Sequence, residues 1–203
     1  MKLGLILECG PGGPDEQVYS HLVRTLSPKV KLECETMIEK RKLVAGCGKV
    51  AAQLLRSGCD RVGIVWDLFP QWRTPAENHC LGQDRDDIFA CLDQAGVGPP
   101  RVELVCVQEE LEAWLLADSR ALVPFFSRPA HAAKKMPEFK APERLSNPKG
   151  HLRKLFHKYF GKGRRYNEMV DALRLFQEVP DWERIRRCPS FVRFVERVLG
   201  QHL

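Results

Sequence analysis

The sequence predicts an α/β fold in which a parallel four-stranded sheet carries helices on both faces. Four short apolar runs typical of buried strands lie at Lys2–Glu8, Lys29–Cys34, Arg61–Asp67 and Val102–Val107. Segments with helical periodicity separate them, and this alternation favours a parallel sheet with right-handed crossovers. The third run shows little polar alternation, as expected for a strand that is buried on both sides.

Helices are expected between these strands. The first begins near Pro14, since proline suits the first turn of a helix and a turn rich in glycine precedes it. Two more are expected at Gly48–Arg56 and Asp84–Gly96, each ended by a glycine, and a fourth at Glu109–Asp118. The long polar connection Leu68–Gln83 lies beside the carboxyl end of a strand, where such loops often carry function.

The pattern changes after Asp118. The segment Phe125–Pro148 is rich in proline, lysine and alanine and is expected to be mostly loop. Helical periodicity returns in four segments: His151–Phe160, Asn167–Phe176, Trp182–Arg187 and Ser190–Leu199. The expected organisation is an α/β domain at residues 1–118 and a basic helical C-terminal region at residues 119–203 packed on it.

Charge is unevenly distributed between these regions. The whole chain carries a net charge of +6, with +11 in residues 119–203 and −5 in residues 1–118. Such asymmetry indicates a nucleic-acid or polyphosphate partner for the basic part. The alternative is an ordinary solvated helical surface.

Other classes of protein are disfavoured. None of the eight cysteines forms a C-x-x-C pair, so the sequence favours reduced cysteines in the core over a zinc site. No apolar run approaches the roughly 18 residues of a membrane span, and the N-terminus does not resemble a signal peptide. A cytoplasmic protein is expected. Acyl-transfer and H-E-x-x-H motifs are absent from the sequence.

Carboxylates follow three of the predicted strands. Glu8 ends the first strand, Asp67 ends the third, and Glu110 and Glu112 follow the fourth. Ligands in open α/β sheets bind outside the carboxyl ends of the strands, so these acids are expected at one edge. Mg²⁺ and Mn²⁺ prefer such oxygen donors, which makes all four candidate metal ligands and catalytic residues. Spacing alone does not choose between Glu110 and Glu112.

A candidate phosphate-binding region follows. Lys149 precedes a predicted helix and could neutralise a phosphate or a developing negative charge, or be a surface lysine. Six further cations have aromatic residues among them and are candidates for contact with a nucleic-acid backbone: Arg153, Lys154, Lys158, Lys162, Arg164 and Arg165. The alternative, favoured for the aromatic residues, is that Phe156, Tyr159 and Tyr166 belong to the core.

Several of these residues also form a recognisable pattern. Glu8, Asp67, the string Glu110–Asp118, the Pro148-Lys149 step and the segment Cys188–Phe191 resemble a bacterial family of unassigned function, domain-of-unknown-function family 4276. The resemblance covers nearly the whole chain. That family is regarded as Toprim-related and is distantly similar to the overcoming-lysogenization-defect nucleases.

The resemblance implies a Toprim-like (Rossmann-like) sheet with a basic helical extension. Toprim domains bind Mg²⁺ through a glutamate after the first strand and an Asp-x-Asp after the third. Glu8 and Asp67 match, but Phe69 stands at the second aspartate and Cys9 separates Glu8 from the following glycine. The implied activity is Mg²⁺- or Mn²⁺-dependent hydrolysis of nucleic acid, DNA in preference to RNA, in phage defence or a mobile element.

Two rival functions stay open. Phe69 favours a degenerate Toprim-like module that binds nucleic acid or a partner protein without chemistry. An enzyme that processes nucleotides at the same acidic edge is the other, although the glycine-rich loop after Glu8 lacks a P-loop motif. Fold alone does not choose among these functions.

Overall fold

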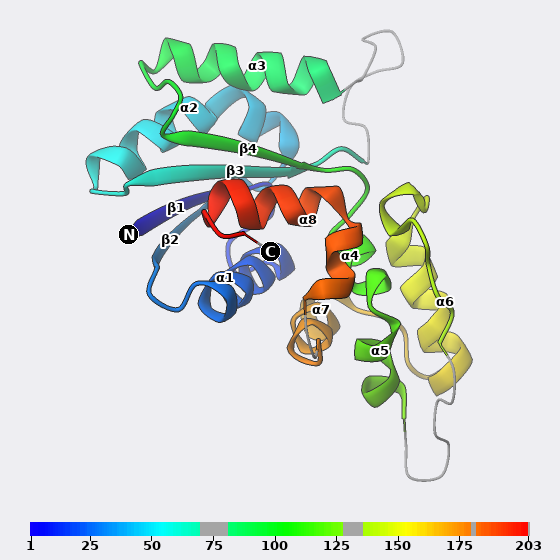
Figure 1. The fold of residues 1–203 in the computed structure, drawn as a ribbon. Helices are drawn as coiled ribbons and strands as arrows, with labels where there is room; N and C mark the ends of the chain where they lie inside the picture. The colour runs from blue at the N-terminus through cyan, green and yellow to red at the C-terminus, as the bar shows by residue number, and fades with distance from the viewer. Residues whose placement is uncertain (70–80, 128–135, 180–181, 203) are drawn as a thin grey trace, which may run out of the picture.

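A computed structural model describes residues 1–69, 81–127, 136–179 and 182–202 of the chain. Its centre is a parallel four-stranded sheet with helices on both faces, as predicted (Figure 1). The strands run in the order β2-β1-β3-β4 and have the following bounds: β1, Lys2–Leu7; β2, Lys31–Thr36; β3, Arg61–Asp67; β4, Val102–Val107. The second strand therefore begins and ends two residues later than the sequence predicts.

The strand order creates a crevice between β1 and β3. From β1 the chain first adds β2 on one side and then crosses over to place β3 on the other side. In open α/β sheets, ligands bind at the carboxyl ends of the strands where the order reverses in this way. The register pairs Leu7 with Val65 and Asp67 with Val107, so the ends of the three strands are nearly level.

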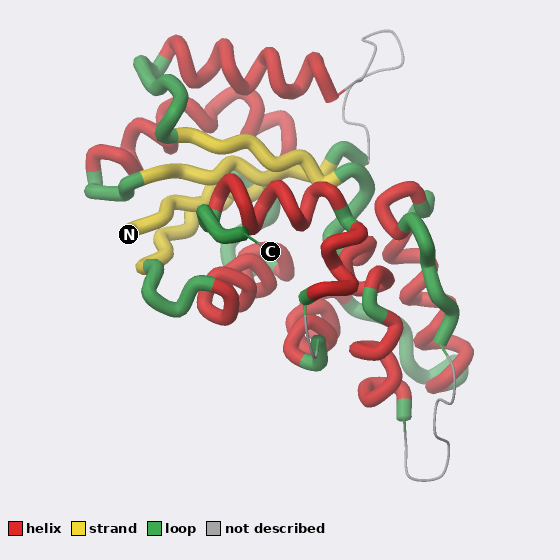
Figure 2. Tube along the Cα trace, in the orientation of Figure 1, coloured by secondary structure: helices red, strands yellow, loops and turns green. Residues whose placement is uncertain are grey.

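Helices cover both faces because successive strand side chains point to opposite sides. Leu5 of β1 faces α1 (Pro14–Leu26), whereas Ile6 faces α2 (Lys40–Arg56) and α3 (Leu81–Gln94). Figure 2 shows α2 and α3 together on one side of the sheet, with α1 on the other.

Helix α2 is longer than predicted. It begins at Lys40 and not at Gly48, because Leu43, Cys47, Ala51 and Leu54 form a continuous buried stripe through the glycines. Tertiary packing of this stripe outweighs the low helix propensity of glycine. Helix α3 likewise begins at Leu81, three residues before the predicted start, and residues 70–80 of the predicted long connection lie outside the described residues.

Gly48 allows α2 and α3 to approach closely. A Cβ atom at this position would lie 2.1 Å from the carbonyl oxygen of Cys91, which belongs to the α3 backbone. We expect Gly48→Ala to lower the free energy of unfolding by about 2 kcal/mol, because overpacking forces the two helices apart. Chemical unfolding would measure the change.

Gly46→Ala is the matched control for this variant. Its Cβ would lie 3.1 Å from Cε of Met37, the mobile end of a long side chain. The alanine should therefore be tolerated, or stabilise the helix by up to about 1 kcal/mol through its higher helix propensity. Equal losses in the two variants would show that helix crossing at Gly48 is not the cause.

The C-terminal region is helical, as predicted, but α6 begins three residues earlier than predicted and the last predicted helix is divided into α8 and the π turn η4. Helix α4 starts at Glu112, since Glu109 and Glu110 belong to the preceding turn. The segment predicted as loop contains the end of a helix and a short 3₁₀ turn. The bounds are α4, Glu112–Ala117; α5, Ser119–Phe126; η2, Pro142–Arg144; α6, Pro148–Phe160; α7, Glu168–Gln177; η3, Glu183–Arg187; α8, Pro189–Arg193; and the π turn η4, Phe194–Val198.

This region shares a core with one face of the sheet. Trp114 of α4 packs edge-on against Tyr19 of α1 and against Phe191 of α8. The π turn lies so close to β3 that a Cβ at Gly63 would be 2.8 Å from Cγ1 of Val198. Helices α4 and α6 lie beyond the carboxyl ends of the strands (Figure 1).

Candidate active site at the carboxyl edge of the sheet

Glu8 and Asp67 lie side by side at the crevice between β1 and β3. The backbone N–H of Asp67 donates a hydrogen bond of 3.2 Å to Oε2 of Glu8. A cavity of about 10 Å³, enough for one water or one small ion, opens beside them. Asp15 and Tyr19 of α1 also line this cavity, so three carboxylates share its wall.

Asp15 is a site residue that the sequence reasoning missed. It lies in the first turn of α1, where an acid complements the helix dipole. The sequence pattern therefore indicated only a role at the start of the helix. The tight turn after β1 brings the start of α1 back over the strand ends. Asp15 follows a strand and a glycine-rich turn, and this position is the sequence signal that could have placed it at the carboxyl edge of the sheet.

Lys149 lies among a second set of carboxylates and forms ion pairs with them. Its Nζ lies 3.2 Å from Oε1 of Glu110, 3.9 Å from Oε1 of Glu112 and 2.5 Å from Oε2 of Glu168. Its backbone N–H also donates to Glu110 at 3.2 Å, because Lys149 stands in the first turn of α6. Lys149 therefore holds the acids that follow β4 against the start of α7, and the structure brings both predicted glutamates into one cluster.

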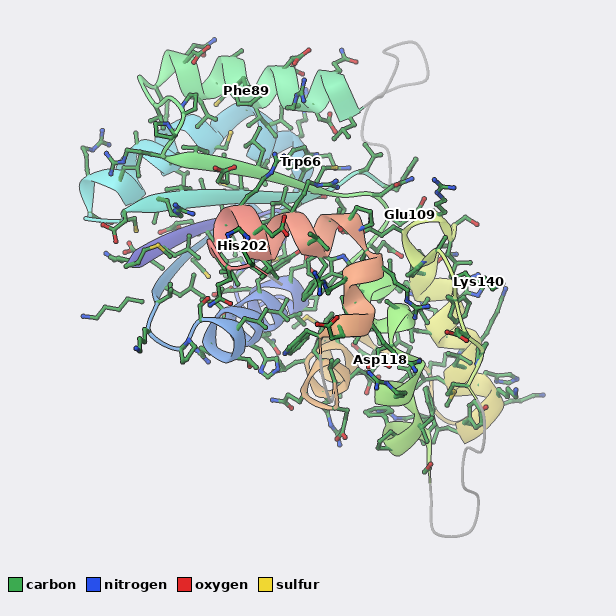
Figure 3. The ribbon with its side chains drawn as sticks, in the orientation of Figure 1. Trp66, Phe89, Glu109, Asp118, Lys140 and His202 are labelled. Carbon is green, nitrogen blue, oxygen red and sulfur yellow. The ribbon has the colours of Figure 1, made fainter. Side chains whose placement is uncertain are left out.

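Glu112 is the most buried member of this cluster. It is 4% exposed, and the hydroxyl of Tyr166 donates a hydrogen bond of 2.9 Å to its Oε1. Tyr166 and Glu168 were not predicted as partners, since they lie more than 50 residues further along the chain. Glu109, by contrast, is only partly buried (Figure 3), and burial raises its pKa against the opposing effect of the Asn147 backbone beside α6.

The two sets of carboxylates influence each other electrostatically. Burial, followed by the charges of Asp15, Glu8 and Glu112, raises the pKa of Asp67 well above its usual value. Burial also raises the pKa of Asp15 to about 6, against the opposing effect of Lys149. Burial raises the pKa of Glu8 as well, and the positive charge of Lys40 partly offsets this effect. Burial and the neighbouring carboxylates therefore favour the protonated forms of these three acids.

The pKa of Glu112 predicts a pH-dependent stability. Burial raises this pKa to about 7, against a usual value near 4.3 in an unfolded chain. Between these values the folded state holds the proton more tightly, so stability should fall as pH rises from about 5 to 8. We expect Glu112 to account for a loss of about 2 kcal/mol, measurable by chemical unfolding at both pH values.

Glu112→Gln should flatten this dependence, because glutamine accepts the hydrogen bond of Tyr166 without titrating. Asp15 and Asp67 also have raised pKa values, so a smaller fall with pH should persist in the variant. A variant with the full pH dependence of the wild type would contradict the assignment to Glu112.

The four predicted metal ligands differ in their fit to a divalent cation. The described residues contain no group of three or more His, Cys, Asp or Glu side chains already arranged to hold a metal ion. Mg²⁺, however, is often held by one or two carboxylates, with water and substrate phosphate as its other ligands. Glu8 and Asp67 fit this mode of binding, whereas Glu110 and Glu112 are engaged by Lys149.

The predicted nucleic-acid-binding cations lie along α6 and the loop that follows it. Arg164 forms an ion pair with buried Asp171 and packs over the ring of Phe156. The aromatic residues belong to the core, as favoured: Phe156 and Tyr166 are buried and Tyr159 is partly buried. The other cations are exposed: Arg153, Lys154, Lys158, Lys162 and Arg165.

Comparison with known proteins identifies the family. Residues 56–199 match the model of a family described as a domain of unknown function, DUF4276. The chain belongs to this family. The matched segment contains Asp67, Glu110, Glu112 and Lys149 but begins after Glu8. No curated protein and no solved structure matches the chain. Among the described residues of this DUF4276 protein, no helix is long and apolar enough to cross a membrane.

Proposed function

We propose that this DUF4276 protein is a Toprim-like, Mg²⁺- or Mn²⁺-dependent hydrolase of nucleic-acid phosphodiesters. The observation that carries the proposal is the convergence of Glu8, Asp67 and Asp15 at the reversal of strand order. Uncompensated carboxylates are costly to bury, and a divalent cation would offset that cost. The resemblance to Toprim nucleases supports the same reading, with phage defence or a mobile element as the implied setting.

The side chains of the crevice would have different roles in hydrolysis. Glu8 and Asp67 would hold the metal ion, with Glu8 as ligand or general base, and Asp15 would stand across the cavity from them. A bound Mg²⁺ or Mn²⁺ lowers the pKa of a coordinated water and neutralises charge on a phosphodiester. The exposed cations of α6 would contact the nucleic-acid backbone.

A second function is favoured by the Lys149 cluster. Its ammonium group occupies the space between Glu110, Glu112 and Glu168, where its charge stabilises carboxylates that could otherwise bind a cation. Together with Phe69 at the second aspartate position, this contact favours a module that binds nucleic acid or a partner protein without hydrolysis.

Metal binding to the wild type and to Asp67→Asn separates the two functions. Calorimetry with Mn²⁺ and Mg²⁺ should detect binding to the wild type and its loss in the variant. Hydrolysis of single- and double-stranded DNA and RNA should fall at least about a hundredfold in the variant, because metal ions contribute several kcal/mol to such reactions. Asp93→Asn, on the exposed surface of α3, is the matched control and should behave as the wild type.

Failure of the folded wild type to bind either cation, with nucleic acid present or absent, would contradict the hydrolase. Nucleic-acid binding that is insensitive to chelator but weakened by salt would then support the binding module.

A further inference from the structure

A second pocket lies next to the Lys149 cluster, with which it shares Glu168. It has a volume of about 400 Å³ and lies between the exposed side of α6 and the start of α7. Its wall includes three arginines and one acid: Arg153, Arg164, Arg165 and Glu168. This composition differs from that of the crevice, where carboxylates predominate.

Two of these arginines form no ion pair within the part of the chain that the structure describes. Arg164 is held by buried Asp171, and Glu168 is held by Lys149 at 2.5 Å. Arg153 and Arg165 are exposed, and neither forms an ion pair with a residue that the structure describes. After these pairings two guanidinium groups of the pocket are left without an ion-pair partner among the described residues.

The pocket offers hydrogen-bond donors but little surface for stacking. Of the described residues that line it, Tyr166 alone is aromatic, and it is buried with its hydroxyl bound to Glu112. A base or a planar ring would therefore find no exposed aromatic face on the lining that the structure describes. Two guanidinium groups match a phosphate, which they can contact through paired N–H donors.

We propose that this pocket binds a phosphate monoester at the end of a nucleic-acid strand. A terminal phosphate carries close to two negative charges at neutral pH, whereas an internal phosphodiester carries one, so two free arginines suit the terminal group. The inference rests on the proposed function, because the Glu168–Lys149 ion pair joins the pocket to the Lys149 cluster at the carboxyl edge of the sheet. Lys149 in turn acts electrostatically on Asp15 and Asp67 of the crevice.

Binding of matched oligonucleotides in EDTA tests this site without hydrolysis. Three strands of one sequence carry a 5′-phosphate, a 3′-phosphate or hydroxyl groups at both ends. The wild type should bind one phosphorylated strand about tenfold more tightly than the hydroxyl strand. Arg153→Gln/Arg165→Gln should abolish that preference, while Arg41→Gln/Arg56→Gln, which removes two exposed charges from α2, should retain it. Circular dichroism would confirm that both double variants are folded.

Equal affinity of the wild type for all three strands would overturn the proposal, as would a preference that survives in Arg153→Gln/Arg165→Gln. A nucleoside monophosphate that binds as tightly as the phosphorylated strand would also overturn it, since the ligand would then be a free nucleotide. A preference in EDTA for a phosphorylated strand, combined with absence of hydrolysis in Mg²⁺ and Mn²⁺, would support the pocket and contradict the hydrolase.

Discussion

Replacement of Lys149 by methionine should lower the free energy of unfolding by about 3 kcal/mol at pH 8. The variant leaves Glu110, Glu112 and Glu168 facing one another without their common partner. Removing one member of a buried ion pair costs about 3–5 kcal/mol, and the lower value applies because the Lys149 side chain is 23% exposed. Chemical unfolding at pH 8 would measure the loss.

The loss should be smaller at pH 5, where Glu112 takes up a proton. Burial already raises its pKa to about 7, and removal of the lysine charge would raise it further. Lys149→Met/Glu112→Gln should recover part of the stability, so the two changes should not be additive. Lys154→Met, an exposed position on the same helix, is the control and should cost less than about 0.5 kcal/mol.

Trp114→Ala should lower the free energy of unfolding by about 4 kcal/mol. Trp114 is fully buried where the helical region meets the sheet, in contact with Tyr19 and Phe191. Its Nε1–H donates to Oγ of Ser190 at 2.8 Å and to Oε1 of buried Glu143 at 3.3 Å. The variant therefore creates a large cavity and removes a donor from a buried carboxylate.

Trp114→Phe separates these two effects, because it retains most of the ring volume and loses the N–H donor. We expect a loss of about 1–2 kcal/mol for this variant. Phe89→Ala, at a position that is 39% exposed on α3, should have little effect. If Trp114→Ala were no more destabilising than Phe89→Ala, Trp114 would not be the link between the two regions.

The two sets of carboxylates differ in how well they could bind a divalent ion. Lys149 compensates the glutamates of its cluster, which makes them a structural link between the helical region and the sheet. Within the part of the chain that the structure describes, Glu8, Asp15 and Asp67 form no ion pair, and their pKa values are raised. A divalent ion would therefore gain more from the crevice than from the lysine cluster, which makes Asp67 the most informative position for mutation.

Local sequence patterns were sufficient to predict the sheet. Apolar runs that are buried on both sides need a layer of helices above and below, so the strands and the α/β class follow from composition and period. The prediction failed where packing outweighed local propensity, as in α2, whose buried stripe continues through Gly46 and Gly48. Helix α5, which includes Phe125, was missed because proline and a short length obscure its periodicity.

By itself the sequence determined the parallel sheet, the carboxylates at its strand ends and the basic character of the C-terminal region. Only the tertiary structure decided that β1 and β3 are neighbours, which puts Glu8 beside Asp67. It also decided that Lys149 and Glu168 meet, and that Arg164 is held by Asp171. The physical reason is that strand order and ion pairing depend on contacts between distant segments, whereas the periodicity of the sequence records only whether each residue faces the core.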